Sequence, residues 1–242
     1  MNSFIYQKVG VIMEQFYPVL SKCPLFYNID RTQYKALLSC INSYTKSYKN
    51  NEYIIIAGNE INYVGIILGG SVEIIKENPA GARHIMDFLG ASNLFGEGIV
   101  CTMERISPVT VRAKEDTKIL FVPYEKIIKS CGNSCSFHLQ LIKNMMMLLG
   151  EKNFNLNRKI ELLMLKGMRE KLAAFLLYES KRQNSQTFQI IPNRNELAEY
   201  LNVSRTSMCR ELARMKDLGM LDYYQNSFKL LSIDDLNDCL MK

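Results

Sequence analysis

The chain has 242 residues, of which 48% are hydrophobic and 22% are charged, and its formal net charge is +6. This balance supplies an ordinary buried core and excludes a chain that is disordered throughout. The mild basicity is compatible with a nucleic-acid partner but does not require one.

No apolar run approaches the roughly 18 residues of a membrane-spanning helix. The N-terminal segment is broken by Lys8 and Glu14 and lacks a small-residue cleavage site, unlike a secretory signal. We therefore expect a cytoplasmic protein with no membrane partner.

Seven cysteines are scattered along the chain without a CxxC pair or a zinc-finger spacing. This pattern predicts free thiols in a reducing compartment and no metal site. The sequence also contains no nucleophile–base pair, P-loop or metal triad. We therefore predict no cofactor and no catalytic residues, and we expect that the protein is not an enzyme.

Residues 10–45 are predicted to be helical, with Leu37, Leu38 and Ile41 forming an apolar stripe. From about residue 46 to residue 125 the composition changes to short β-rich runs separated by glycine or asparagine turns. The clearest strands are expected at 53–56, 65–68, 72–75 and 118–122. This spacing predicts a β-roll of about 75 residues.

A long helix is predicted from about Ser134 to Leu165, and its apolar positions alternate between spacings of three and four residues. Asn153 occupies the one remaining position of this seam. Such a seam is typical of a parallel homodimer, in which paired asparagines fix the register; the alternative is a helix that packs on its own domain. The predicted dimer-interface residues are Ile142, Met146, Leu149, Asn153, Leu156, Ile160 and Leu163.

Lys166 and Gly167 interrupt the long helix. A glycine inside a helix costs about 1 kcal/mol relative to alanine, and we interpret this one as a hinge. A second helix is expected from Met168 to about Lys181.

Residues 193–218 have the pattern of a helix-turn-helix. Asn193 and Glu196 form a capping pair before the first helix. Asn202 suits the left-handed conformation that the turn needs, and Ser204 caps the second helix.

One face of the second helix carries Met208, Leu212 and Met215, which we expect to be buried. The opposite face centres on Arg210, and the segment 204–216 has four basic residues against one acid. This arrangement is typical of a helix that enters the major groove; the alternative is an ordinary solvated face. The predicted DNA-contacting residues are Arg205, Thr206, Ser207, Cys209, Arg210, Arg214 and Lys216.

A β-hairpin, or wing, is predicted over 220–231, so the chain consists of a β-roll, a long helix, a hinge and a winged helix-turn-helix. This order resembles the Crp–Fnr superfamily of bacterial transcription regulators over nearly the whole chain. The resemblance is carried by Phe95-Gly96-Glu97, Val111-Arg112-Ala113, the run from Asn195 to Leu201, Val203-Ser204-Arg205 and Arg210-Glu211-Leu212.

The resemblance implies an α+β fold with an N-terminal cyclic-nucleotide-binding-like β-roll (a jelly roll), a long dimerisation helix and a C-terminal winged helix-turn-helix. The expected parts are an effector-sensing domain over 1–133, the dimerisation helix and hinge over 134–166, and a DNA-binding domain over 167–242.

The resemblance also implies a homodimer that binds a palindromic double-stranded DNA operator, with RNA polymerase left open as a further partner. Arg205 and Arg210 would meet guanine edges or nearby phosphates. Family members often have a glutamate where this chain has Thr206, so their commonest operator half-site is not expected here.

The effector site departs from the cyclic-nucleotide pattern. Binders of cyclic nucleotides resemble this chain at Gly96 and Glu97 but carry an arginine and a small polar residue at the places of Ser107 and Pro108. Arg105 lies two residues too early and is expected on the other side of a strand. Cyclic AMP is therefore not the expected ligand.

Iron–sulfur sensing would need several thiolates near the N-terminus, where only Cys23 is present. Neither His84 nor His138 lies in a recognisable haem site. We expect instead an apolar or weakly acidic small molecule of unknown identity between the roll and the long helix, with a cysteine redox trigger as the alternative. The predicted effector-binding residues are Leu68, Phe95, Gly96, Glu97, Ser107 and Asn153.

The leading hypothesis is thus an effector-gated, dimeric transcription regulator. One rival is an effector-independent regulator of the same shape, whose β-roll serves only as a scaffold. The other is a cyclic-nucleotide-binding regulatory subunit that does not bind DNA, against which the helix-turn-helix argues.

Overall fold

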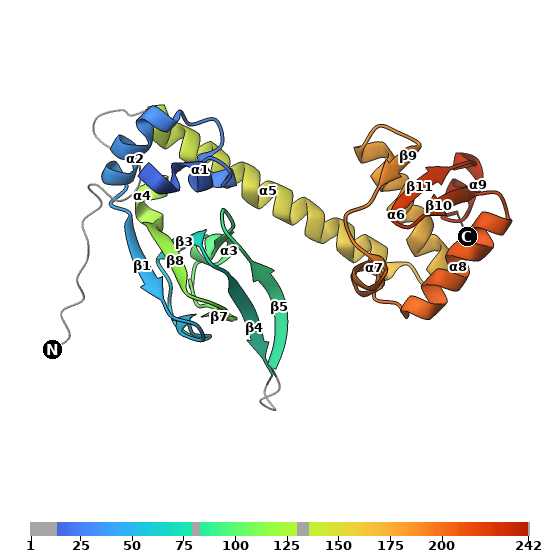
Figure 1. The fold of residues 1–242 in the computed structure, drawn as a ribbon, viewed down its shortest axis with the longest axis horizontal. Coiled ribbons are helices and arrows are strands. Elements are labelled where there is room, and N and C mark those ends of the chain that lie inside the picture. Colours follow the sequence, from blue (N-terminus) through green and yellow to red (C-terminus); the bar gives the residue numbers. More distant parts are fainter. Residues whose placement is uncertain (1–13, 79–82, 130–135, 242) are drawn as a thin grey trace. The chain divides into compact units, whose positions relative to one another are not determined.

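The computed structural model describes residues 14–78, 83–129 and 136–241. The chain divides into two compact units, Met1–Glu151 and Lys152–Lys242, which Figure 1 draws in blue to yellow-green and in yellow to red. The boundary between them falls inside the long helix α5 (Ser136–Met164).

The first unit begins with short helices rather than the continuous helical segment predicted over 10–45. They are η1 (Glu14–Phe16), α1 (Tyr17–Leu20), η2 (Pro24–Phe26), η3 (Arg31–Gln33) and α2 (Tyr34–Cys40). Pro24 and the left-handed residues Asn28 and Asn42 account for the breaks, because neither a proline inside a helix nor a positive φ continues it. Leu37 and Leu38 are buried, as predicted.

Two antiparallel four-stranded sheets form the β-roll. The first has the order β1-β8-β3-β6 and contains β1 (Tyr44–Tyr48), β3 (Tyr63–Gly69), β6 (Leu94–Phe95) and β8 (Thr117–Pro123). The second has the order β2-β7-β4-β5 and contains β2 (Tyr53–Ile55), β4 (Val72–Glu77), β5 (Arg83–Leu89) and β7 (Thr110–Ala113). The predicted strands are all present, whereas β1 begins inside the segment that was predicted to be helical.

The inner faces of the sheets supply most of the first unit's core, including Val64, Ile66 and Phe121. The short helices α3 (Glu97–Val100) and α4 (Tyr124–Ile128) flank the sheets. Figure 1 shows α1, α2 and α4 gathered at one end of the roll around the first turns of α5. Leu141 and Leu148 of α5 join the same core.

The second unit contains the last part of α5 and a winged helix-turn-helix. Its elements are α6 (Met168–Arg182), β9 (Thr187–Gln189), α7 (Arg194–Tyr200), α8 (Arg205–Asp217), β10 (Leu221–Tyr224), β11 (Ser227–Leu230) and α9 (Ile233–Asp238). The sheet order is β10-β11-β9, so the predicted hairpin gains a third, unpredicted strand. Its core centres on Leu172, Leu176, Leu212 and Phe228.

The interruption at Gly167 is built as a helix cap. Gly167 has an extended backbone, and its N–H donates to Glu170 Oε2 at 3.2 Å. The last turns of α5 pack against α6, because Leu162 lies in the core of the second unit and Arg158 Nη2 lies 3.8 Å from Glu179 Oε1. Gly167 therefore starts α6, after α5 has ended at Met164, and hinge motion there stays a prediction.

Among the helices that the structure describes, none is long and apolar enough to cross a bilayer.

Asn144 anchors α5 to the N-terminal helices and should be a stability determinant. Its buried Nδ2 donates to the carbonyl oxygens of Leu25 at 2.9 Å and Tyr27 at 2.7 Å. Asn144→Ala leaves these carbonyls without that donor, so we expect the free energy of unfolding to fall by about 2 kcal/mol. Urea denaturation followed by circular dichroism measures this, with the exposed Asn155→Ala as control; equal losses in both variants would contradict the prediction.

Candidate nucleic-acid interface

The helix-turn-helix is held by side-chain caps at both of its helix starts. Asn193 Oδ1 accepts from the N–H groups of Asn195 at 2.9 Å and Glu196 at 3.1 Å, and the Glu196 carboxylate accepts from the Asn193 N–H at 2.8 Å. At α8, Ser204 Oγ accepts from the Ser207 N–H at 3.2 Å. Asn202 between the helices has a φ of +52°. The capping pair, the turn at Asn202 and the cap at Ser204 are all found where the sequence predicts them.

Packing fixes which face of α8 is exposed. Met208, Leu212 and Met215 are buried, and Ala198 of α7 is buried in the same core. A small residue there lets the two helices approach closely. The opposite face of α8 is therefore turned to solvent.

The exposed face carries most of the predicted DNA-contacting residues. Arg205, Thr206, Ser207, Arg210, Arg214 and Lys216 are exposed. Cys209 departs from the prediction, because it is half-buried and packs against the core of the second unit. It lies only one position from the buried Met208, so helical geometry turns its side chain partly inward.

The basic residues of α8 differ in their partners. Lys216 Nζ lies 2.6 Å from Asp222 Oδ1, and Arg214 Nη1 lies 3.4 Å from Glu211 Oε2. The hydrogen bond between Lys216 and Asp222 raises the pKa of the ammonium and lowers the pKa of the carboxyl.

Arg205 and Arg210 form no ion pair with any residue in the described part of the chain. The uncompensated positive charge is thus concentrated in the first half of the helix.

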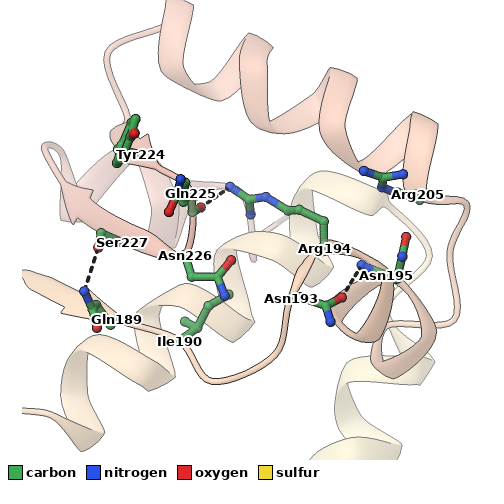
Figure 2. Close-up of a pocket in the computed structure, with 10 residues that line it drawn as sticks. All are labelled: Gln189, Ile190, Asn193, Arg194, Asn195, Arg205, Tyr224, Gln225, Asn226 and Ser227. Atoms are coloured by element: carbon green, nitrogen blue, oxygen red, sulfur yellow. Dashed lines mark hydrogen bonds between the residues drawn. The ribbon is translucent and has the colours of Figure 1, made fainter.

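A cleft of about 720 Å³ lies between the wing and the start of α7. Its lining residues are Gln189, Ile190, Asn193, Arg194, Asn195, Arg205, Tyr224, Gln225, Asn226 and Ser227. Figure 2 shows Arg194 extended toward Gln225 and Arg205 standing on the α8 side of the cleft. Tyr224 at the wing tip is 76% exposed. Sequence reasoning did not single out Arg194, because its acceptor, the Gln225 carbonyl, lies in the wing turn 31 residues later.

The predicted effector residues of the β-roll are built into its interior. Leu68, Phe95, Glu97 and Ser107 are buried, and Gly96 has a left-handed φ of +85°. The Phe95 ring lies so close to Gly65 that a side chain at this glycine would collide with it. The Ser107 hydroxyl donates to the Val109 carbonyl at 2.7 Å.

Asn153, the last predicted effector residue, is exposed on α5 and belongs to the second unit.

Arg105 is not on a strand, contrary to the prediction. It has a φ of +54° in a turn, and its guanidinium donates to Asn62 Oδ1 at 3.1 Å, approaches Glu125 Oε1 at 3.3 Å and lies over the Tyr124 ring. Arg112 lies 2.5 Å from the buried carboxylate of Glu73. Both arginines are thus already engaged with carboxylates.

The predicted dimer seam is an apolar stripe along α5. Met146 is 69% exposed, Leu156 60% and Ile160 54%, although all three are large and apolar. Leu163 is also exposed, Ile142 and Leu149 are half-buried, and Asn153 accepts from Asn157 at 3.5 Å.

Residues 45–133 match the family model of the cyclic nucleotide-binding domain, and residues 170–239 match that of the Crp-like helix-turn-helix domain. The chain belongs to the Crp–Fnr superfamily. The α+β fold, with its N-terminal β-roll and C-terminal winged helix-turn-helix, is confirmed. The chain is a DNA-binding transcription regulator of this superfamily.

Two curated relatives illustrate the relationship. The anaerobic regulatory protein of Haemophilus influenzae is 22% identical over 198 residues, which cover 79% of this chain and 73% of that protein. The transcriptional activator protein anr of Pseudomonas aeruginosa is 23% identical over 179 residues, covering 72% of this chain and 70% of that protein.

Solved structures show the same fold. The catabolite activator protein of Thermus thermophilus matches with a TM-score of 0.51 at 21% identity, covering 90% of this chain and 98% of that one. A mutant of CooA from Carboxydothermus hydrogenoformans matches with a TM-score of 0.50 at 22% identity, covering 80% and 86%.

The structure bears on the sensing chemistries that the superfamily suggests. Within residues 14–78, 83–129 and 136–241, no three His, Cys, Asp or Glu side chains are grouped so as to hold a metal ion. Burial raises the pKa of the Cys23 thiol to about 12, so this thiol stays protonated at neutral pH. Cys131 and Cys135 lie outside the described residues.

The β-roll should not bind cyclic nucleotides. Cyclic AMP and cyclic GMP each carry a negative phosphate that needs a cation, while Ser107 is neutral and Arg105 and Arg112 are paired. Isothermal titration calorimetry of the purified protein with either nucleotide is expected to give no binding in the micromolar range. Saturable micromolar binding of one of them would overturn this assignment.

Proposed function

We propose that this protein is a dimeric, sequence-specific transcription regulator that reads DNA with α8 and is gated by a small molecule other than a cyclic nucleotide. The observation that carries the proposal is the exposed start of α8. Arg205 and Arg210 lie in this half of the helix without a carboxylate partner among the described residues, while the other face of the helix packs into the core. A helix presented in this way suits the major groove.

The two arginines would supply direct readout. An arginine can donate two hydrogen bonds to O6 and N7 of a guanine, which is worth about 1–3 kcal/mol of discrimination. Arg210 faces the centre of the groove and Arg205 reaches in from the first turn. Thr206 between them carries no negative charge to accept strongly from a cytosine amino group, so the half-site should differ from that of glutamate-bearing family members.

Arg214 and Lys216 suit the DNA backbone rather than bases. Each has a carboxylate neighbour on the protein, Glu211 and Asp222 respectively. A phosphate must compete with that neighbour, so these two residues should add less affinity than unpaired cations would.

The exposed seam of α5 supports the dimer. A run of half-exposed or exposed large apolar residues on one helix face costs free energy in water, and a second copy of the same helix would cover it. Asn153 in the seam would pair with its counterpart and fix a parallel register. Two recognition helices related by a twofold axis would then read an inverted repeat.

Effector gating is supported by the β-roll, whose Phe95-Gly96-Glu97 segment keeps a buried carboxylate beside a left-handed glycine. The dense packing of Leu68, Phe95 and Ser107 favours a second candidate, an effector-independent regulator in which the roll is a scaffold. DNA affinity measured with and without small molecules extracted from cells separates the two. A change in affinity supports gating, and an unchanged one supports the scaffold.

Selection of bound sequences from a random DNA pool tests the DNA-reading function. We expect an inverted repeat whose half-site centres lie about 10 base pairs apart, or a near multiple of that spacing. Arg210→Ala should relax the preference at one base in each half-site, because one bidentate contact is lost. Lys216→Ala is the control and should weaken all sequences evenly. Recovery of a non-palindromic sequence, or an unaltered preference with Arg210→Ala, would contradict the proposal.

The seam is tested separately by analytical ultracentrifugation. Leu156→Asp places a charge in the proposed interface, so we expect dimers to dissociate to monomers at concentrations where the wild type stays dimeric. Because Leu156 is exposed in the single chain, the Leu156→Asp variant should still fold. Asn155→Asp, one position away and outside the seam, should leave the dimer intact. A monomeric wild type would refute the dimer.

A further inference from the structure

The wing tip is tied to the rest of the second unit from two sides. From β9, the Ile190 N–H donates to the Asn226 carbonyl at 3.0 Å, and the Gln189 amide donates to Ser227 Oγ at 3.1 Å. From α7, Arg194 Nη2 donates to the Gln225 carbonyl at 2.8 Å. Figure 2 shows the Arg194 side chain crossing the cleft to reach this carbonyl.

The surroundings of Arg194 are unusual for a surface arginine. Its guanidinium lies 5.0 Å from the ring centroid of Tyr223 and 4.9 Å from that of Phe228. The side chain is half-buried, and burial lowers the pKa of the guanidinium. No carboxylate within the described ranges pairs with it. Desolvating a cation without an acid is costly, so its contacts with the wing must offset that cost.

Arg194 is badly placed to bind a DNA phosphate itself. One terminal nitrogen is engaged with the Gln225 carbonyl, and the other is buried without a hydrogen-bond partner. To meet a phosphate, the side chain would have to leave both aromatic rings. Arg205, on the other side of the cleft, is exposed.

The conformation of the wing tip depends on contacts from outside the wing. Gln225 adopts a φ of +48°, which is unfavourable for a residue with a side chain. Tyr224 beside it is largely exposed, so little packing of its own fixes its direction. A donor that fixes the Gln225 carbonyl therefore fixes where Tyr224 points.

We propose that Arg194 is a positioning residue that braces the wing tip against α7, so that Tyr224 is held in place to contact the DNA backbone beside the recognition helix. This inference rests on the proposed DNA-binding function. An arginine suits the role because its planar guanidinium can lie over the rings while it donates in its own plane, which a lysine ammonium does not do.

A double-mutant cycle tests the brace. Binding of fluorescent DNA carrying the sequence selected from the random pool is measured by anisotropy for wild type, Arg194→Met, Tyr224→Ala and the double variant. Each single change is expected to lower affinity on the order of five- to tenfold. The double variant should lose no more than either single one, because the second change removes a contact that the first has already disrupted.

Two further variants separate positioning from direct contact. Arg210→Ala combined with Arg194→Met should give losses that multiply, since the residues act on different contacts. Arg194→Lys keeps the charge but not the planar donor, and it should bind as weakly as Arg194→Met. Thermal unfolding checks that each variant is folded. If Arg194→Met does not fold, Arg194→Lys replaces it in the binding measurements.

The proposal is overturned if Arg194→Met binds as wild type, if its loss multiplies with that of Tyr224→Ala, or if Arg194→Lys restores full affinity. It is also overturned if Tyr224→Ala has no effect, because the wing tip then makes no contact to be positioned. Failure of the wild type to bind any sequence would instead refute the DNA-binding function, so the two failures are distinguishable.

Discussion

The close packing of α7 against α8 is the constraint on which the exposed surface of the second unit depends. Ala198 is small enough to let the helices approach, and Met208 and Leu212 fill the core beneath. Since a helix can bury only one stripe, this packing turns the face with Arg210 to solvent. The caps at Asn193 and Ser204 satisfy backbone N–H groups that the two helix starts would otherwise leave open. Substitutions at the contact between α7 and α8 should therefore alter DNA binding even though they replace no residue on the exposed face of α8.

The folded structure, and not the number of basic residues alone, decides which positive charges on this surface remain unpaired. The recognition helix has several basic residues, yet Lys216 is paired with Asp222, and Arg214 lies 3.4 Å from Glu211, whose carboxylate also pairs with Arg169. The cations left without partners lie in the first half of the helix, where side chains reach furthest into a groove. In the proposed readout, contacts to the DNA backbone and contacts to bases fall on different parts of one helix, which would separate overall attraction to DNA from choice of sequence.

The two units use buried polar groups in different ways. In the first unit, Asn144 and Ser107 satisfy carbonyls inside a dense core, which favours one fixed arrangement. In the second unit, Arg194 is half-buried with one buried nitrogen unpartnered, and its contact with the wing depends on a single carbonyl and two rings. In the proposed brace, these few contacts fix the direction in which Tyr224 points.

The sequence alone was sufficient for features set by neighbours a few residues apart. Helical periodicity and cap residues placed α5 to α8 within a residue or two, because capping and one-sided burial act over one or two turns. Only the tertiary structure decided the rest. The strand at Tyr44–Tyr48 forms because β8 pairs with it. Lys216 is neutralised by Asp222 of β10, and Arg194 finds its acceptor at Gln225. These partners lie on other strands or in the turn that joins them, and no local pattern encodes a contact that chain folding alone brings together.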